Sequence, residues 1–149
     1  MAKFIYRMQS ILNIKNQMEN QAKMEFGRAQ RKLLEEEERL QKLFDRKESY
    51  LEEGRKLRLH ALKVQSLRDN EYAVARMEEY IEAQKEAIRR AEQKVEEARQ
   101  KLQEVMQERK MQEKLREKAF EQFVAEENSK ESKEVDELTS YTYGQKLAD

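Results

Sequence analysis

The most regular stretch of the chain lies between residues 74 and 105, where seam-type positions recur at alternating spacings of three and four. All are apolar except Gln84, and they are Val74, Met77, Ile81, Gln84, Ile88, Ala91, Val95, Ala98, Leu102 and Val105. Nearly every residue between them is Glu, Lys, Arg, Gln or Ala, which favour helix and suit faces turned to water. The pattern predicts a coiled-coil helix that buries one narrow stripe against a partner helix.

A second, poorer stripe occupies the first part of the chain. Its apolar members are Phe4, Met8, Ile11, Met18, Ala22, Phe26, Ala29, Leu33, Leu40, Leu43, Tyr50 and Leu57, and the same count places Lys15, Glu36, Lys47 and Gly54 at seam positions. Two four-residue steps in succession, through Ala22, predict a local departure from the seven-residue repeat there.

The two stripes are out of phase with each other. Continued past Val64, the first stripe falls on Arg68 and Ala75, whereas the second begins at Val74. Ser66 or Asp69 is suited to cap a new helix. We therefore predict a helix over residues 4–57, a turn over 58–66, a helix over 67–138 and a disordered tail over 139–149.

One unbroken helix is the alternative to this turn. A lone Gly costs a helix only about 1 kcal/mol, and the chain has no Pro to forbid continuation. Such a helix would be ~200 Å long and would have to dimerise.

With the turn, the predicted fold is all-α, a long antiparallel two-helix coiled-coil hairpin in a single domain. The chain then places Phe4 near Phe120 and Phe123, and Lys15 near Arg109 and Lys110. The two chain ends share the open end of the hairpin, and the second helix continues beyond the first as an acidic, unpaired segment.

The second stripe also loses its phase after Val105, where Met106 and Met111 fall off the count. This irregularity lies at the level of the double four-residue step around Ala22. Because the two departures would face each other across a hairpin, their agreement favours the hairpin over the single long helix.

Composition supports an extended helical protein rather than a globular one. The 149 residues include 42% charged residues, no Pro and three Gly, and the mean hydropathy is −1.15. No apolar run is long enough for a membrane span, and the start lacks the apolar core of a signal peptide, so we expect a cytoplasmic protein without membrane insertion. The absence of Cys excludes disulfides and thiol chemistry.

Charge is uneven along a chain whose formal net charge is zero. Residues 1–32 contain seven bases and two acids, residues 109–118 five bases and two acids, and residues 126–149 seven acids and three bases. A hairpin brings both basic segments to its open end, beside Phe4, Tyr6, Phe120 and Phe123. Acids interleave the bases and no nucleic-acid-binding motif accompanies them, so the pattern favours an acidic protein surface over nucleic acid.

No residue cluster predicts catalysis, a metal site or a cofactor. The four acids at 35–38 would point in four directions on a helix, whereas a hard cation needs oxygens that converge. The single His, His60, falls in the predicted turn without a cleft. The chain has no phosphate-binding loop and no nucleophile with an activating base, so we expect a protein that is not an enzyme.

A short stripe beside the second seam has two readings. It contains Tyr72, Ala73, Arg76, Tyr80, Ala83 and Ala87 at roughly helical spacing. It could widen the seam, or it could form an exposed aromatic docking surface, since Tyr and Arg are favoured anchors at protein interfaces.

Three segments carry a family resemblance. They are Phe4-x-Tyr6-x-Met8-Gln9-Ser10-Ile11-Leu12, then Val64-Gln65-Ser66-Leu67, and last Lys114-Leu115-Arg116-Glu117-Lys118 followed by Phe123, Glu131, Lys133-Glu134 and Val135-Asp136-Glu137. In content and order they resemble the FliJ family, small cytoplasmic proteins of the bacterial flagellar protein-export apparatus.

The resemblance implies an antiparallel two-helix coiled coil similar to the central stalk of rotary ATPases. It implies that the open end inserts into the hexameric export ATPase, promotes ring assembly and links the ring to a membrane export-gate protein, with export chaperones as further partners. Its implied place is the cytoplasmic face of the inner membrane at the flagellar base, as a monomer when free.

Carried over residue by residue, the resemblance also implies two sites. The ATPase-facing residues are Phe4, Tyr6, Arg7, Met8, Ile11, Lys114, Leu115, Arg116, Lys118, Phe120 and Phe123. The gate-facing residues are Tyr72, Ala73, Met77 and Tyr80. A generic coiled-coil scaffold or homodimer, and the equivalent stalk of a virulence type III secretion system, remain the alternatives.

Overall fold

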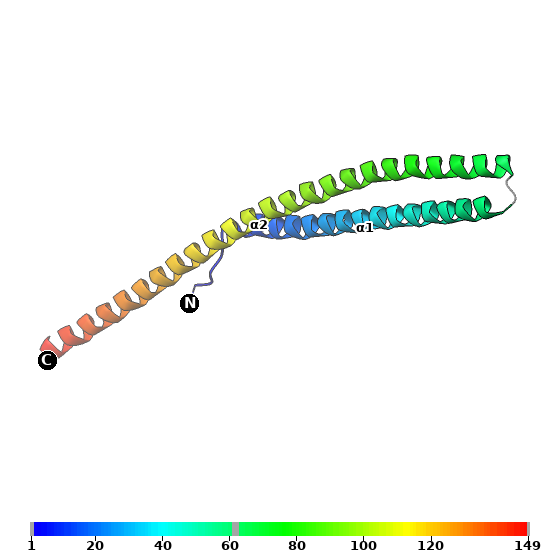
Figure 1. The fold of residues 1–149 in the computed structure, drawn as a ribbon. Helices are drawn as coiled ribbons and strands as arrows, with labels where there is room; N and C mark the ends of the chain where they lie inside the picture. Colours follow the sequence, from blue (N-terminus) through cyan, green and yellow to red (C-terminus); the bar gives the residue numbers. More distant parts are fainter. Residues whose placement is uncertain (1, 61–62, 149) are drawn as a thin grey trace. The chain divides into compact units, whose positions relative to one another are not determined.

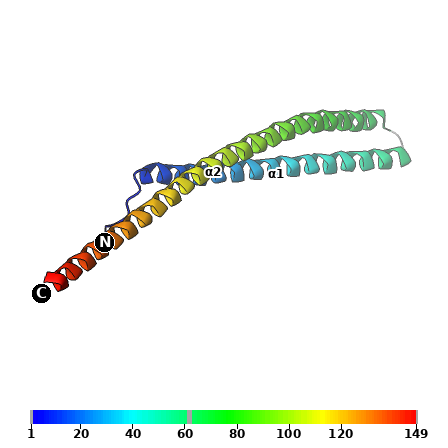
Figure 2. The same ribbon diagram turned by 90° about the vertical axis from the view of Figure 1, so that its left-hand side faces the viewer.

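Two helices make up the secondary structure of the computed structural model, which describes residues 2–60 and 63–148. They are α1 (Gln9–Leu59) and α2 (Val64–Ala148), and no strand occurs among the described residues. Figures 1 and 2 show the cyan part of α1 running beside the green first part of α2. The predicted all-α, antiparallel two-helix fold is confirmed.

Contacts divide the chain into two units, each an antiparallel pair of segments from α1 and α2. One unit is Gln21–Gln103, which includes the end of α1 and the start of α2. The other combines Met1–Asn20 with Glu104–Asp149, the two ends of the chain.

In the Gln21–Gln103 unit, the predicted stripe on α2 is the seam. Every predicted position from Val74 to Leu102 is buried or half-buried, and Met77, Ile81 and Ala91 are only 7%, 4% and 5% exposed. The facing positions of α1 are also shielded, and they are Ala22, Phe26, Ala29, Leu33, Leu40, Leu43, Tyr50 and Leu57. The α2 stripe therefore packs against α1 of the same chain, as predicted from the turn between the two out-of-phase stripes.

The polar positions of the α1 seam are shielded as well. Glu36 and Gly54 are buried and Lys47 is half-buried, all three at positions that the seven-residue count assigned to the seam. Lys47 forms an ion pair with Glu78 of α2, with 3.4 Å between Nζ and Oε1. Seam positions are therefore set by helical geometry, and apolarity is not required at each of them.

The predicted departure from the repeat around Ala22 is corrected by the structure. Shielded positions Leu12, Lys15, Glu19, Ala22 and Phe26 alternate by three and four without a break. Glu19, 5% exposed, takes the seam position assigned to Met18, which is half-buried beside it. The count chose Met18 because it is apolar, and so passed over the neighbouring Glu19.

The same correction applies to α2 beyond Val105. Arg109 and Gln112 are half-buried at the next positions of the same count, which then continues to Ala119 and Phe123. The predicted irregularity is thus a change from apolar to polar seam residues and leaves the phase unchanged.

The helix ends also differ from the prediction. Residues 2–8 precede α1, which begins at Gln9 rather than at residue 4. The connection is shorter than predicted, because α1 ends at Leu59 and α2 begins at Val64; its residues 61 and 62 lie outside the described residues. Ser66 and Asp69 consequently lie inside α2 and do not cap it.

At the other end, α2 continues through Ala148, past the predicted end at residue 138. The predicted tail is therefore helical as far as Ala148, in a segment without Pro whose residues 128–146 are all exposed. Within the described part of the chain, neither helix has a stretch long and apolar enough to cross a membrane.

Candidate functional site

An aromatic cluster attaches residues 2–8 to α2 at Phe120 and Phe123. The Phe4 ring lies 5.2 Å from the Phe120 ring in an edge-to-face arrangement and 5.4 Å from the Phe123 ring in a tilted one. The Arg116 guanidinium lies over the Phe4 ring at 5.7 Å. Each aromatic pair of this kind contributes about 0.5–1.5 kcal/mol beyond its burial. The predicted proximity of Phe4 to Phe120 and Phe123 is confirmed.

Hydrogen bonds extend this contact toward the start of α1. The Tyr6 hydroxyl donates to Oε1 of Gln112 at 3.2 Å, and Nε of Arg116 donates to Oε1 of Gln9 at 3.1 Å. The amide of Gln9 donates to the Tyr6 carbonyl at 3.1 Å, which joins the N-terminal segment to the first turn of α1. Arg116 therefore holds both Phe4 and the beginning of α1.

Ion pairs continue the seam between the two chain ends. Lys15 Nζ lies 2.8 Å from Glu108 Oε2, near the predicted level of Arg109 and Lys110. The Arg109 side chain, 18% exposed, pairs with Glu19 across the seam and with Glu113 at 2.8 Å on its own helix. Hydrogen bonds to Glu113 and Glu19 raise the pKa of Arg109 against the opposing effect of burial.

A groove beside the aromatic cluster is lined by both chain ends. Its residues are Phe4, Ile5, Tyr6, Arg7 and Met8 from the N-terminal segment and Ala119, Gln122, Phe123 and Glu126 from α2. Ile5 is 80% exposed and Met8 38% exposed, so apolar side chains remain available at its edge. We call this groove, with Arg116 and Phe120, the terminal surface.

The structure brings together part of the predicted ATPase-facing set. Phe4, Tyr6, Arg116, Phe120 and Phe123 are in contact with one another or with a shared neighbour, and Arg7 and Met8 line the groove. The remaining members are exposed and do not line the groove, and they are Ile11, Lys114, Leu115 and Lys118.

Sequence reasoning missed four residues of the groove, which are Ile5, Ala119, Gln122 and Glu126. It also missed Gln9 and Gln112, which hold Arg116 and Tyr6. Gln112 could have been found by extending the seven-residue count past Val105 without requiring apolar residues. Ile5 gave no periodic signal, because residues 2–8 are not helical. Gln9 is the first residue of α1 and lies outside the predicted seam.

A second candidate surface lies on α2 in the Gln21–Gln103 unit. The Arg76 guanidinium lies 6.0 Å from the Tyr72 ring and 5.4 Å from the Tyr80 ring, and it donates to the Tyr80 hydroxyl at 3.3 Å. Tyr72 is 67% exposed and Tyr80 45% exposed. Met77, by contrast, is buried in the seam and Ala73 is half-buried. Of the predicted gate-facing set, Met77 is therefore not a surface residue, and Arg76, which the prediction did not include, contacts both Tyr72 and Tyr80.

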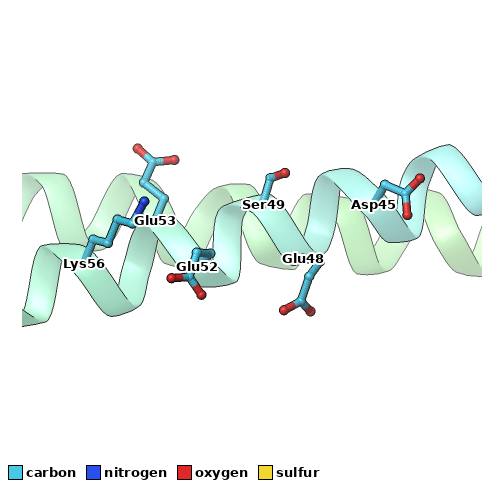
Figure 3. Close-up of a pocket in the computed structure, with 6 residues that line it drawn as sticks. All are labelled: Asp45, Glu48, Ser49, Glu52, Glu53 and Lys56. Carbon is cyan, nitrogen blue, oxygen red and sulfur yellow. The ribbon is translucent and has the colours of Figure 1, made fainter.

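A shallow hollow lies along α1. It is lined by Asp45, Glu48, Ser49, Glu52, Glu53 and Lys56. Figure 3 shows all six on one helix, with Glu48 and Glu53 pointing to opposite sides. Among residues 2–60 and 63–148, no group of His, Cys, Asp or Glu side chains is arranged to hold a metal ion.

Comparisons with known proteins identify one family and one similar fold. The family model described as "Flagellar FliJ protein" matches residues 4–148. No curated protein matched the chain. Among solved structures, CT670 of Chlamydia trachomatis, described as a candidate YscO homolog, is similar over 99% of both chains, with 20% sequence identity and a TM-score of 0.76. At that identity the likeness is one of fold.

Proposed function

This chain belongs to the family of the flagellar FliJ protein, and from that premise we propose that it is a non-enzymatic stalk and adaptor of the flagellar type III export apparatus. The hexameric export ATPase is its main partner, and it acts at the cytoplasmic face of the inner membrane at the flagellar base. The observation that carries the proposal is the terminal surface, where both chain ends form one aromatic and basic structure.

The terminal surface is suited to a protein partner with acidic groups. Arg7, Lys114, Arg116 and Lys118 are exposed around the aromatic cluster. Aromatic and Arg side chains are the residues that most often dominate binding energy at protein interfaces. In the proposed mechanism this end binds the ATPase ring, and the paired chain segments keep Phe4 and Phe123 in fixed positions for that contact.

The surface formed by Tyr72, Arg76 and Tyr80 supports a second contact, with the membrane export-gate protein. The two Tyr side chains are exposed, and Arg76 contacts both rings. Because these contacts restrict the side chains before a partner binds, less conformational entropy is lost on binding. Met77 takes no part, because its side chain packs in the seam. A stalk with separate ATPase and gate surfaces would link the two partners.

The equivalent stalk of a virulence secretion system is the second candidate. The fold shared with the candidate YscO homolog supports it, but that fold suits both systems. The family model that matches the chain is the flagellar one, which favours the flagellar assignment.

Charge reversal at the terminal surface tests the ATPase contact. In the variant with Arg7→Glu and Arg116→Glu, we expect stimulation of ATPase ring assembly and hydrolysis to fall roughly tenfold or more, since like charges across an interface cost several kcal/mol. Purified ATPase, titrated with each stalk variant, provides the measurement.

Two further variants make the result specific. The variant with Lys114→Glu and Lys118→Glu changes neighbouring charges that make no contact to the aromatic cluster. If this variant also stimulates the ATPase less, the loss cannot be due to the broken contacts of Arg116. Lys42→Glu with Lys101→Glu makes the same charge change on the Gln21–Gln103 unit and should leave stimulation intact. Undiminished stimulation by both terminal-surface variants would reject the assignment.

A further inference from the structure

The last part of α2 has an apolar stripe in a new helical phase. The seam ends at Phe123, and its continuation falls on charged residues such as Lys130 and Glu137. Apolar side chains recur instead on another side of the helix, at Val124, Val135 and Leu138, with the polar residues Asn128 and Glu131 at the intervening positions of an alternation of four and three. The stripe thus turns to a different side of the helix where α1 no longer accompanies it.

No segment of the described chain covers this stripe. Residues 128–146 are all exposed, with Val135 at 59% and Leu138 at 66%. The contacts observed in this segment join near neighbours on the helix, as in the Lys130–Glu127 pair and the bond from the Thr142 hydroxyl to the Leu138 carbonyl. A solvated single helix gains little stability from such contacts, so a partner helix would stabilise it.

Acidic residues accompany the stripe on the same face. Glu131 lies four residues before Val135, and Glu134 lies four residues before Leu138, the spacing that places side chains together on a helix. The segment from residue 126 to the end has seven acids against three bases. A partner that covers the apolar stripe must therefore approach these carboxylates.

We propose that this face of α2 docks a basic amphipathic helix of another protein. The partner's apolar side packs on Val124, Val135 and Leu138, and its Lys or Arg side chains pair with Glu131 and Glu134. A second copy of the chain would bring the same acids to the contact, and anionic lipid would be repelled by them. Val135 and Leu138 lie outside the terminal surface, and the proposed contact goes beyond those with the ATPase and the gate.

The test uses the full chain and a designed probe. The probe is a fluorescent peptide of about three heptads with Leu at the two seam positions and Lys at the flanking ones, and its counterpart carries Glu in place of Lys. Fluorescence anisotropy at low salt should show at least tenfold tighter binding of the Lys peptide. Val135→Ala with Leu138→Ala should weaken that binding at least fivefold without altering stimulation of the export ATPase.

A matched pair of charge variants separates a defined face from general attraction. Glu131→Lys with Glu134→Lys should weaken binding of the Lys peptide at least tenfold. Asp136→Lys with Glu137→Lys makes the same change in net charge on other sides of the helix and should cost at most threefold.

Equal losses in the two charge variants, no loss in the alanine variant, or no binding of the Lys peptide would overturn the proposal. A doubled mass of the free chain that the alanine variant abolishes would assign the face to a second copy, and capture by anionic vesicles would assign it to a membrane. Either result would also overturn the proposal. Because ATPase stimulation is measured on the same variants, this outcome is independent of the terminal surface.

Discussion

Gly54 permits a close contact between the helices of the Gln21–Gln103 unit. The Asn70 side chain, 9% exposed, donates from Nδ2 to the Tyr50 carbonyl at 2.8 Å. A Cβ atom on Gly54 would lie 2.5 Å from Asn70 Oδ1. Since residue 54 stands one helical turn beyond the Tyr50 carbonyl, the missing side chain gives Asn70 access to it.

Gly54→Ala is therefore expected to destabilise the protein, although Ala is normally favoured over Gly in a helix by about 1 kcal/mol. Gly27→Ala is the matched control, because its Cβ would meet only Arg31 Nη1 at 3.9 Å. Urea unfolding followed by circular dichroism should show a lower free energy of unfolding for Gly54→Ala and a higher one for Gly27→Ala. If both substitutions stabilise the chain, Gly54 does not serve the Asn70 contact.

Glu36 is a buried carboxylate held by groups from both helices. Lys32 lies 2.8 Å and Arg39 3.2 Å from its Oε1, and Gln84 donates from Nε2 to its Oε2 at 2.5 Å and to its backbone carbonyl at 2.9 Å. The hydrogen bond from Lys32, followed by that from Gln84, lowers the pKa of Glu36 below its ordinary value of 4.5. The ionised form is therefore the one that the fold stabilises.

This shift predicts a pH dependence of stability. Because the pKa in the folded chain is below that in the unfolded chain, the contribution of Glu36 is present above pH 4.5 and is lost as the pH falls through the folded value. The free energy of unfolding should thus decline less between pH 5 and about pH 3 in Glu36→Gln than in the natural chain. If the free energy of unfolding falls equally with pH in the two proteins, Glu36 is not the group responsible for that fall.

At the scale of elements, the sequence predicted both helices and the face that each buries. It did so because most seam positions are apolar and recur with the helical period. It missed Glu19, Arg109 and Gln112, which hold seam positions through ion pairs and hydrogen bonds rather than apolar burial. It also missed that residues 2–8 leave the helix, since no Pro or Gly marks that boundary.

The N-terminal segment depends on Phe4 for its attachment to α2. Phe4→Ala removes both aromatic pairs and the Arg116 contact, which is about 1–3 kcal/mol of local attachment. Trypsin should then cleave after Lys3 and Arg7 several times faster than in the natural chain, while the helical circular dichroism signal stays the same. Ile5→Ala is the control, because Ile5 is 80% exposed; equal acceleration by both variants would contradict the role of Phe4.

At the scale of the whole molecule, the candidate site depended on the hairpin. Once the chain was predicted to turn near residue 60, the basic and aromatic segments at its two ends had to meet, and Phe4 does contact Phe120 and Phe123. The family resemblance seen in those segments is confirmed by the model that matches residues 4–148. Which partners bind there could not follow from periodicity, because seam spacing describes only the contact between the helices.

One chain supplies both helices of the coiled coil. Multi-angle light scattering of the purified protein measures this directly, because the mass does not depend on molecular shape. We predict a mass of 18.0 kDa, that of a single chain, over a wide range of protein concentrations. A stable mass of twice that value would contradict the account, since the seam of each helix would then be covered by a second molecule.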